Sequence, residues 1–368
     1  MTKDTILSRL GYNHDINHRI RHIMDQIYTL SQLIQQSDCE YTIYDLGRRV
    51  QPISNKQFES IEAAQQPYPY PLQRHAHLAI AYWNKSKQPW IWFLKLPLDE
   101  RGLLQQGDIG NFIKYVVEAI GVSLSGDLNE EQQQKLSSNP YTFKPKDDKM
   151  AMFHSVLRTT LKQPMSQYYE HAQTYLSGNN GWDNWQFVGV QGLADVCANL
   201  DKENNGVALR KALSHLPTTV LYATLGCLEH IDLPEKLALK QQDIINDLCN
   251  DDSTDLFLLS AHIRALSGAE TKILTQALTQ ILSSERLSHP EVLVAIAGRC
   301  WAGLEDLATA NLFLLRLAQT GDQQLFNQLF SDLVMQPKLR MCMLQILHGE
   351  ADPKLADALL TLQKTTKS

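Results

Sequence analysis

The chain has 368 residues, of which 43% are hydrophobic and 20% charged, a composition typical of a globular protein with two or three domains. Its net charge of −6 at pH 7 argues against nucleic-acid binding, which needs a basic surface. No apolar run reaches the roughly 20 residues that span a bilayer, and the six cysteines lack CxxC spacing. We therefore expect a cytoplasmic protein with free thiols, no membrane segment, and no metal or other cofactor.

One or two helices are predicted over residues 1 to about 37. Their apolar stripe recurs at helical spacing and comprises Ile16, Ile20, Ile23, Ile27, Leu30 and Ile34. His14, His18 and His22 follow one another at intervals of four on the opposite face, and two such imidazoles can chelate a metal. Asp25 is near enough to be tested as a further ligand, but nothing else completes the shell. We interpret the histidines as part of a solvated polar face.

A small, mostly antiparallel sheet is predicted next. The stretch EYTIYDLGRRVQPIS, residues 40–54, is rich in β-branched and aromatic residues and is typical of a strand ending in a turn. HAHLAIAYW and PWIWFLKLPL alternate on either side of the turn NKSKQ and predict a hairpin. Both faces carry apolar groups, so we expect helices over the sheet and assign Trp90 and Trp92 to the core or to inter-domain packing. Residues 1–121 therefore predict an α+β module.

Residues 122–147 predict a polar linker with one short helix, for which Asp127 and Glu130 form a capping-box pattern. Residues 148–368 predict an all-α domain of about a dozen helices. Prolines are expected at the first position of several helices, where a missing N–H costs no hydrogen bond. These prolines are Pro217, Pro234, Pro290, Pro337 and Pro353. Helix caps are predicted at Ser253, His289 and Asp352.

A sequence repeat lies inside this all-α domain. Arg264, Gly268 and Glu270 recur 35 positions later, as an arginine, a glycine and a glutamate. The later set is Arg299, Gly303 and Glu305. A period of this size is typical of paired-helix repeats and predicts a HEAT- or armadillo-like array. The match covers one pair of repeats only, so an irregular all-α bundle remains the alternative.

Charged residues flank two strands of the predicted sheet. The set comprises Asp45, Arg48, Arg49, Asp99, Glu100 and Arg101. If the two strands are neighbours, these charges gather at one edge beside Tyr68, Tyr70 and Trp83. Neighbouring carboxylates can serve as an acid and base pair, and arginines can clamp a carboxylate or phosphate. The alternative is a set of strand-end ion pairs and turn caps, and we assign no catalytic residue.

Two arginines in the helical domain are also candidate binding residues. Arg264 and Arg299 occupy equivalent positions of the repeat. Arginines on successive repeats can line a groove and pair with acidic groups of a partner. The alternative is that they bond carbonyl groups between repeats, or Glu270 and Glu305.

The strings YDLGRRVQPIS, YPYPL and WFLKLPLDERG follow one another in the N-terminal module. With them the chain resembles an uncharacterised bacterial family, a domain of unknown function, over nearly its whole length. The residues that carry the resemblance are Asp45, Gly47, Arg48, Arg49, Pro69, Pro71, Trp92, Phe93, Leu96, Pro97, Asp99 and Glu100. The resemblance implies a bacterial cytosolic protein and supplies no activity, cofactor or site.

The sequence contains none of the motifs GxxxxGK(S/T), GxGxxG, HExxH or GxSxG, and no Cys–His metal spacing. We therefore predict a protein-interaction or scaffold protein that offers a helical-repeat surface to a protein partner, rather than an enzyme. The alternative is a small-ligand sensor or an enzyme with a charged site at the sheet edge. Nucleic-acid binding by the helices is a third hypothesis, which the acidic balance disfavours. We expect no nucleic-acid and no membrane partner.

Overall fold

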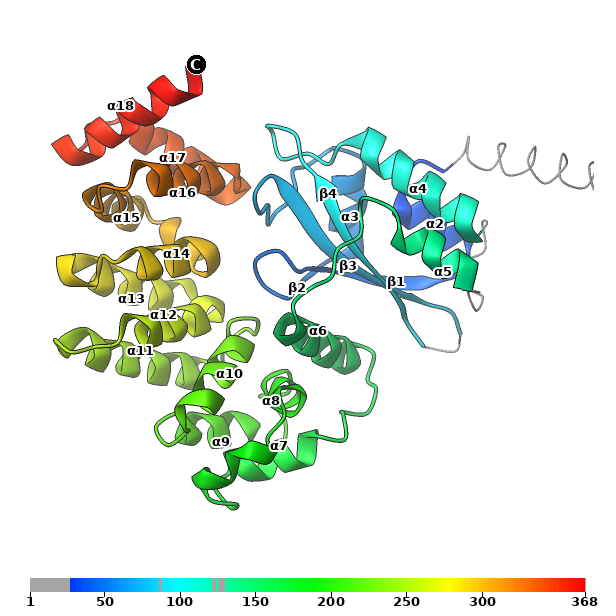
Figure 1. The fold of residues 1–368 in the computed structure, drawn as a ribbon, viewed down its shortest axis with the longest axis horizontal. Helices are drawn as coiled ribbons and strands as arrows, with labels where there is room; N and C mark the ends of the chain where they lie inside the picture. The colour runs from blue at the N-terminus through cyan, green and yellow to red at the C-terminus, as the bar shows by residue number, and fades with distance from the viewer. Residues whose placement is uncertain (1–26, 86–87, 121–123, 125–129, 368) are drawn as a thin grey trace, which may run out of the picture. The chain divides into compact units, whose positions relative to one another are not determined.

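The computed structural model describes residues 27–85, 88–120, 124 and 130–367. The chain divides into two compact units (Figure 1). The sheet unit comprises Met1–Gly47 and Pro52–Lys144, and the helical unit comprises Arg48–Gln51 and Pro145–Ser368. Four residues within the first part of the chain, Arg48–Gln51, therefore belong to the helical unit. The predicted order, a small antiparallel sheet followed by many helices, is confirmed.

The sheet unit contains one sheet with the strand order β2-β1-β3-β4. The strands are β1 (Glu40–Asp45), β2 (Gln51–Ile53), β3 (His75–Trp83) and β4 (Trp90–Pro97). β3 pairs antiparallel with both β1 and β4, which confirms the predicted hairpin. The helices of this unit are α2 (Leu30–Gln36), α3 (Asn55–Glu62), α4 (Gln106–Ile120) and α5 (Glu130–Ser137).

The core of the sheet unit lies on one face of the sheet. Leu78, Ile80 and Tyr82 alternate along β3, so their side chains share that face. They pack in one cluster with Phe58 of α3 and Phe112 of α4. Figure 1 shows α2 and α4 along this side of the sheet. The alternation of the sequence thus fixes which strand face the helices cover.

The two tryptophans of β4 pack with the same cluster. Trp92 is 8% exposed, and its ring lies 4.7 Å from that of Tyr82 and 5.5 Å from that of Phe112. Trp90 is half-buried and stacks on Tyr82 with ring centroids 5.7 Å apart. The expectation that these rings serve packing is confirmed for the core of the sheet unit.

The helical unit consists of short helices joined by tight turns. They are α6 (Asp147–Thr160), α7 (Tyr169–Leu176), α8 (Val190–Cys197), α9 (Asn205–Ala212), α10 (Thr218–Leu228), α11 (Glu235–Asn250), α12 (Leu256–Ala265), α13 (Thr271–Ser283), α14 (Pro290–Arg299), α15 (Leu307–Gln319), α16 (Gln323–Met335), α17 (Pro337–His348) and α18 (Pro353–Lys367). Four 3₁₀ turns lie between them: η1 (Trp182–Phe187), η2 (Leu266–Gly268), η3 (Glu285–Leu287) and η4 (Trp301–Leu304).

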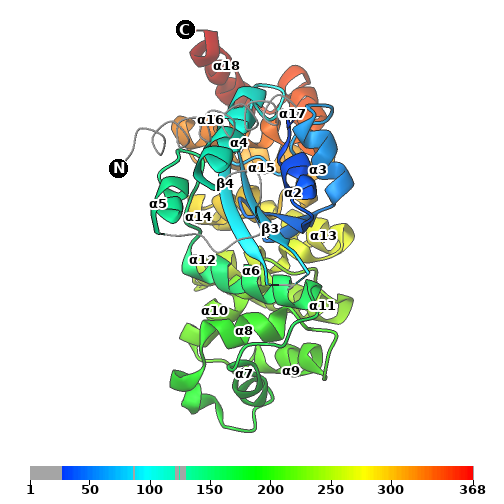
Figure 2. The ribbon, with the colours of Figure 1, turned by 90° about the vertical axis from the view of Figure 1, so that its right-hand side faces the viewer.

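Helices of the helical unit pack on their second neighbours along the chain. α10 packs on α12 and α12 on α14, while α11 packs on α13 and α13 on α15. The unit thus proceeds from α7 at one end to α18 at the other in both views (Figures 1 and 2). In this arrangement the ends of α10, α12 and α14 follow one another along one side of the unit.

The helix starts largely follow the predicted prolines and caps. Pro290, Pro337 and Pro353 are the first residues of α14, α17 and α18. Pro217 and Pro234 lie one position earlier, as N-caps of α10 and α11, where their extended ψ still suits the φ that the ring imposes. His289 and Asp352 accept amide hydrogen bonds at helix starts as predicted. The cap of α12 is Asp255, whose carboxylate reaches the Phe257 amide; Ser253 instead bonds Asp251.

Several predictions concern residues outside the described part of the chain. The histidines of the proposed polar face, most of the N-terminal apolar stripe, Asp127 and part of the NKSKQ turn lie there. Ile27, Leu30 and Ile34, which end the stripe, are described and buried. The short helix expected after Asp127 is present as α5.

Candidate functional site

Asp45 ends β1 and is buried inside the sheet unit. The Tyr68 hydroxyl donates to Asp45 Oδ1 at 2.6 Å, and the Gly47 amide donates to the same oxygen at 3.2 Å. Burial, followed by the charge of Asp45, raises the pKa of Tyr68 well above its usual value, so its hydroxyl remains a donor. These contacts hold the residues after β1 in a tight turn.

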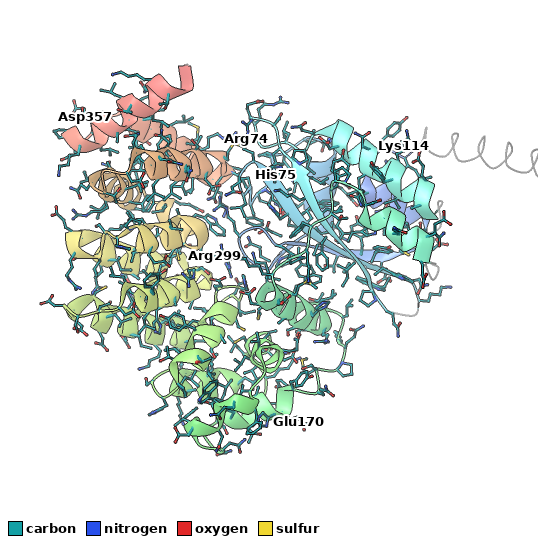
Figure 3. The ribbon with its side chains drawn as sticks, in the orientation of Figure 1. Arg74, His75, Lys114, Glu170, Arg299 and Asp357 are labelled. Atoms are coloured by element: carbon teal, nitrogen blue, oxygen red, sulfur yellow. The ribbon has the colours of Figure 1, made fainter. Side chains whose placement is uncertain are left out.

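Asp99 and Arg101 form a separate turn after β4. Asp99 Oδ1 accepts the amides of Arg101 at 2.9 Å and Leu103 at 2.8 Å, and Oδ2 pairs with Arg101 Nε at 3.1 Å. Slight desolvation opposes ionisation, but these hydrogen bonds outweigh it and lower the pKa of Asp99. Glu100 pairs with Arg74 at 3.2 Å, and both side chains are exposed (Figure 3 labels Arg74). This cluster has the form of a capped turn.

Trp83 lies at the other end of the sheet from Asp45. The register pairs Trp83 with Glu40 at the start of β1, and Asp45 with Leu78. The Trp83 indole N–H donates to Glu40 Oε2 at 3.2 Å. The sheet therefore does not bring Trp83 to the edge where the predicted charges end their strands.

Arg48 is fully buried within the helical unit. Its guanidinium donates to the Ala297 carbonyl oxygen at 3.2 Å and to Asp332 Oδ2 at 2.5 Å. It also lies over the ring of Trp301, 5.4 Å from the centroid. The side chain of Asp332 is 18% exposed, whereas that of Arg48 is 0% exposed. One arginine thus joins the last turns of α14 and α16.

Arg49 makes the corresponding contacts at α10 and α12. Its Nε donates to the Glu229 carbonyl oxygen at 2.9 Å, and its Nη1 donates to the Ser267 carbonyl oxygen at 3.4 Å. Its Nη2 lies 3.3 Å from Asp232 Oδ1, whose side chain is 99% exposed. Carbonyl groups at helix C-termini carry partial negative charge and lack partners within the helix, so they suit a guanidinium.

Each arginine has two acceptors that lie one 35-residue period apart. Asp232 and Ser267, which receive Arg49, are 35 positions apart, as are Ala297 and Asp332, which receive Arg48. Each guanidinium therefore joins a carboxylate to a backbone carbonyl group 35 positions away. We call these acceptors, together with the helix-end residues Glu229 and His230, the helix-end face. It comprises Glu229, His230, Asp232, Ser267, Ala297 and Asp332.

The two repeated arginines converge on Glu229. Arg264 Nε lies 3.3 Å from Glu229 Oε2, and Arg299 Nε lies 3.3 Å from Glu229 Oε1. The Arg299 pair is close enough for an ion pair, but its N–H is not aligned for a hydrogen bond. Arg264 also lies 3.5 Å from Glu291. Their side chains are 32% and 22% exposed, so each arginine keeps a solvent-accessible edge (Figure 3 labels Arg299).

Glu229 itself falls on the 35-residue period. It stands 35 positions before Arg264, which stands 35 before Arg299, and it caps the end of α10. Three positions spaced by 35 residues therefore carry a glutamate, an arginine and an arginine, and the three side chains lie close together. Glu229 thus pairs with an arginine 35 positions later and with another 70 positions later. Arg264 and Arg299 were given Glu270 and Glu305 as possible internal partners, and in the structure both pair with Glu229 instead.

His230 connects Arg48–Gln51 to this charge cluster. The Val50 amide donates to His230 Nδ1 at 3.1 Å, so the neutral ring carries its proton on Nε2, 3.4 Å from Glu229 Oε1. Burial, and then the positive charges of Lys149, Arg299 and Arg49, lower the pKa of His230 well below its usual value. The imidazole therefore acts as a neutral acceptor for the backbone of the arginine segment.

Gly268 allows the arginine segment to approach. A Cβ at this position would lie 1.8 Å from the Ile231 carbonyl oxygen and 2.8 Å from Arg49 Nη2. Gly303, its counterpart in the next repeat, would meet only side-chain atoms, the nearest being Leu278 Cδ1 at 2.6 Å. The same repeated residue thus serves two purposes, and at Gly268 it leaves room for a guanidinium and a backbone carbonyl group.

Sequence reasoning singled out Arg48, Arg49, Arg264 and Arg299 but missed their acceptors. Asp232 and Asp332 have no motif around them, and the carbonyl acceptors leave no trace in a sequence. The one available signal was the period itself, which places Glu229 in register with Arg264 and Arg299. Within the described ranges, no group of three or more His, Cys, Asp or Glu side chains is arranged to hold a metal ion.

The surface of the helical unit also carries two shallow hollows. One, of about 240 Å³, is lined by residues of α15, α16 and α18, including Phe326 and Asp357. The other, of about 250 Å³, lies between α9 and α11 and includes Arg210 and Lys236. Among the helices that the structure describes, none is long and apolar enough to cross a membrane.

The fold combines a small antiparallel sheet with a longer run of packed helices that encloses a buried pair of arginines. The chain belongs to the family described as "Protein of unknown function (DUF3549)", which matches residues 25–363. This confirms the resemblance to an uncharacterised family over nearly the whole chain. Neither the curated proteins nor the solved structures include a match to this chain.

Proposed function

We propose that the protein is a protein-interaction scaffold whose helical unit is a paired-helix array of HEAT or armadillo character. Two features support the array. Helices pack on their second neighbours from α10 to α15, and the turns η2 and η4 follow α12 and α14 at equivalent places. Arrays of this kind place equivalent side chains along one side, where an extended partner can contact several repeats.

The observation that carries the proposal is the binding of Arg48–Gln51 at the helix-end face. This four-residue segment is held by backbone carbonyl groups, carboxylates and an imidazole. These acceptors lie at the ends of α10, α12, α14 and α16. The face thus meets a physical requirement of a peptide-binding surface, because it supplies acceptors both for side chains and for a backbone amide of the bound segment.

The alternative, a small-ligand or catalytic site at the sheet edge, receives less support. Asp45 is buried and accepts hydrogen bonds from Tyr68 and Gly47, and Asp99 is engaged by turn amides. These are the contacts of residues that fix turns. Replacing Asp45 with Asn tests the alternative: the scaffold proposal expects a lower melting temperature without loss of any ligand-induced stabilisation.

Affinity capture with the full-length protein, followed by crosslinking mass spectrometry, tests the scaffold proposal. The expected result is a stoichiometric protein partner with crosslinks to residues 145–368. Crosslinks confined to the sheet unit, or stabilisation by a small molecule with no protein partner, would contradict it. Duplex DNA and RNA serve as controls, and the net charge of −6 predicts no response to either at low salt.

A further inference from the structure

We propose that the helix-end face recognises a partner segment with two adjacent arginines in a bent backbone, and that Arg48–Gln51 occupies the face when the partner is absent. This inference rests on the proposed scaffold function and names the chemistry of the partner. The structure already shows one occupant of the face, the segment Arg48–Gln51. The hydrogen bonds from this segment to the face come from three donor groups: the guanidinium groups of Arg48 and Arg49, and the Val50 amide.

The acceptors favour guanidinium groups over ammonium groups. Arg49 reaches Glu229, Ser267 and Asp232 with three different nitrogen atoms, and Arg48 reaches Ala297 and Asp332 from one planar group. A guanidinium has five N–H donors in a fixed plane, whereas an ammonium is a compact point charge. A lysine at either position would satisfy one acceptor and leave another buried oxygen without its donor.

The third contact reads the backbone of the occupant. His230 Nδ1 accepts the Val50 amide, so the residue after the second arginine must carry an N–H. Proline has none and is excluded at that position. The recognised chemistry is therefore Arg-Arg in a bent backbone, followed by a residue other than proline whose side chain can be buried as that of Val50 is.

The polar contacts of the occupant come from its guanidinium groups and one backbone amide, and the side chain of Val50 is buried beside them. A partner segment with the same groups can therefore replace it contact for contact. Asp232 offers the point of entry, since its side chain is 99% exposed while Arg49 beside it is nearly buried. A partner arginine can pair with Asp232 before the internal segment leaves.

The test uses the full-length protein and a labelled synthetic peptide, LGRRVQPI, which copies residues 46–53. The matched peptides are LGKKVQPI, which keeps the charge, and LGRRPQPI, which removes the amide. Binding is measured by fluorescence anisotropy to wild type and to the double variant Arg48→Ala/Arg49→Ala, which lacks both guanidinium groups that occupy the face. We expect the variant to bind LGRRVQPI at least about tenfold more tightly than wild type does.

The control peptides should each bind the variant at least about tenfold more weakly than LGRRVQPI. A folded variant that binds none of the peptides, or all three equally, would overturn the proposal. If the variant does not fold, hydrogen exchange on wild type replaces it. Excess LGRRVQPI, but not LGKKVQPI, should then speed exchange over residues 46–53, and an unchanged rate would overturn the proposal.

The peptide experiment and the affinity capture test the two proposals separately. A captured protein partner together with no peptide effect would retain the scaffold and reject the arginine motif. Peptide binding without a captured partner would retain the motif and reject the broader function.

Discussion

Gly268 is the residue at which the smallest change has the largest expected effect. In Gly268→Ala the new methyl group would meet the Ile231 carbonyl oxygen, a backbone atom that cannot move alone, and the Arg49 guanidinium. Overpacking of this kind costs roughly 1–3 kcal/mol and more where backbone must shift. We expect Gly268→Ala to lose at least about 3 kcal/mol of unfolding free energy, measured by urea denaturation.

Gly303→Ala is the matched control, because it makes the same change at the equivalent repeat position. Its neighbours Leu278 and Leu274 can rotate away, so we expect a loss of about 1 kcal/mol. Equal losses in the two variants would show that Arg49 and Ile231 do not approach Gly268 as described.

Glu62 is a buried carboxyl group that caps the start of α2. It accepts the Leu30 amide at 2.7 Å and the Ser31 amide at 3.2 Å. Burial raises the pKa of Glu62 to about 7 in the folded protein, from 4.5 in an exposed chain, despite these hydrogen bonds. Between pH 4.5 and about 7 the folded protein holds a proton on Glu62 that the unfolded chain has lost. The contribution of Glu62 to the free energy of unfolding therefore declines as pH rises through about 7.

Raising the pH from 5 to 8 should therefore destabilise wild type by roughly 2–3 kcal/mol relative to Glu62→Gln, whose amide does not titrate. The measurement is the unfolding free energy of both proteins across that range. Parallel pH profiles would mean that Glu62 is already ionised in the fold at pH 5.

At the level of elements, α11 and α12 meet through a buried histidine. His262 Nδ1 lies 2.7 Å from Gln241 Oε1, and burial lowers the pKa of His262 to about 4. Below pH 6.5 the unfolded chain binds a proton that the folded ring does not accept, so stability falls as pH drops from 6.5 towards 4. Wild type should lose roughly 2 kcal/mol more than His262→Gln between pH 7 and 4.5.

Thermal or urea unfolding at fixed ionic strength checks this expectation. The opposite order, with His262→Gln losing more stability in acid, would contradict a buried neutral imidazole. Glu62 and His262 thus have opposite pH dependences over overlapping ranges: Glu62 loses its contribution as pH rises from 4.5 to about 7, and His262 loses its contribution as pH falls from 6.5 to about 4.

Local patterns predicted most elements, because they arise from neighbouring residues. Alternation predicted β3 and β4, and proline positions marked the starts of α14, α17 and α18. The 35-residue period identified Arg264 and Arg299 as equivalent residues. These signals depend on spacings that a single strand, helix or repeat imposes on the chain.

The partners of the arginine segment were beyond such reasoning. Arg49 bonds Glu229 and Arg48 bonds Asp332 across separations of 180 and 284 positions. Three of the acceptors are backbone carbonyl oxygens, which every residue possesses. The sequence around Arg48 and Arg49 was rightly marked as charged, but it predicted a sheet edge rather than burial among helix ends.

For the molecule as a whole, the burial of two adjacent arginines within one helical unit is the feature from which the rest follows. A buried guanidinium loses hydration and is tolerated only where acceptors replace water. The helix ends supply those acceptors, and Asp332 supplies the balancing charge for Arg48. The packed helix ends and the arginine segment therefore stabilise each other.

A double-mutant cycle on Arg48 and Asp332 is the measurement that tests this arrangement most directly. Unfolding free energies are measured for wild type, Arg48→Ala, Asp332→Ala and the double variant, with Arg74 and Glu100 as the exposed control pair. A buried, hydrogen-bonded pair predicts a coupling energy of at least about 1.5 kcal/mol, against less than about 0.5 kcal/mol for the control. Equal, near-zero coupling in both pairs would contradict the burial of Arg48 at the helix-end face.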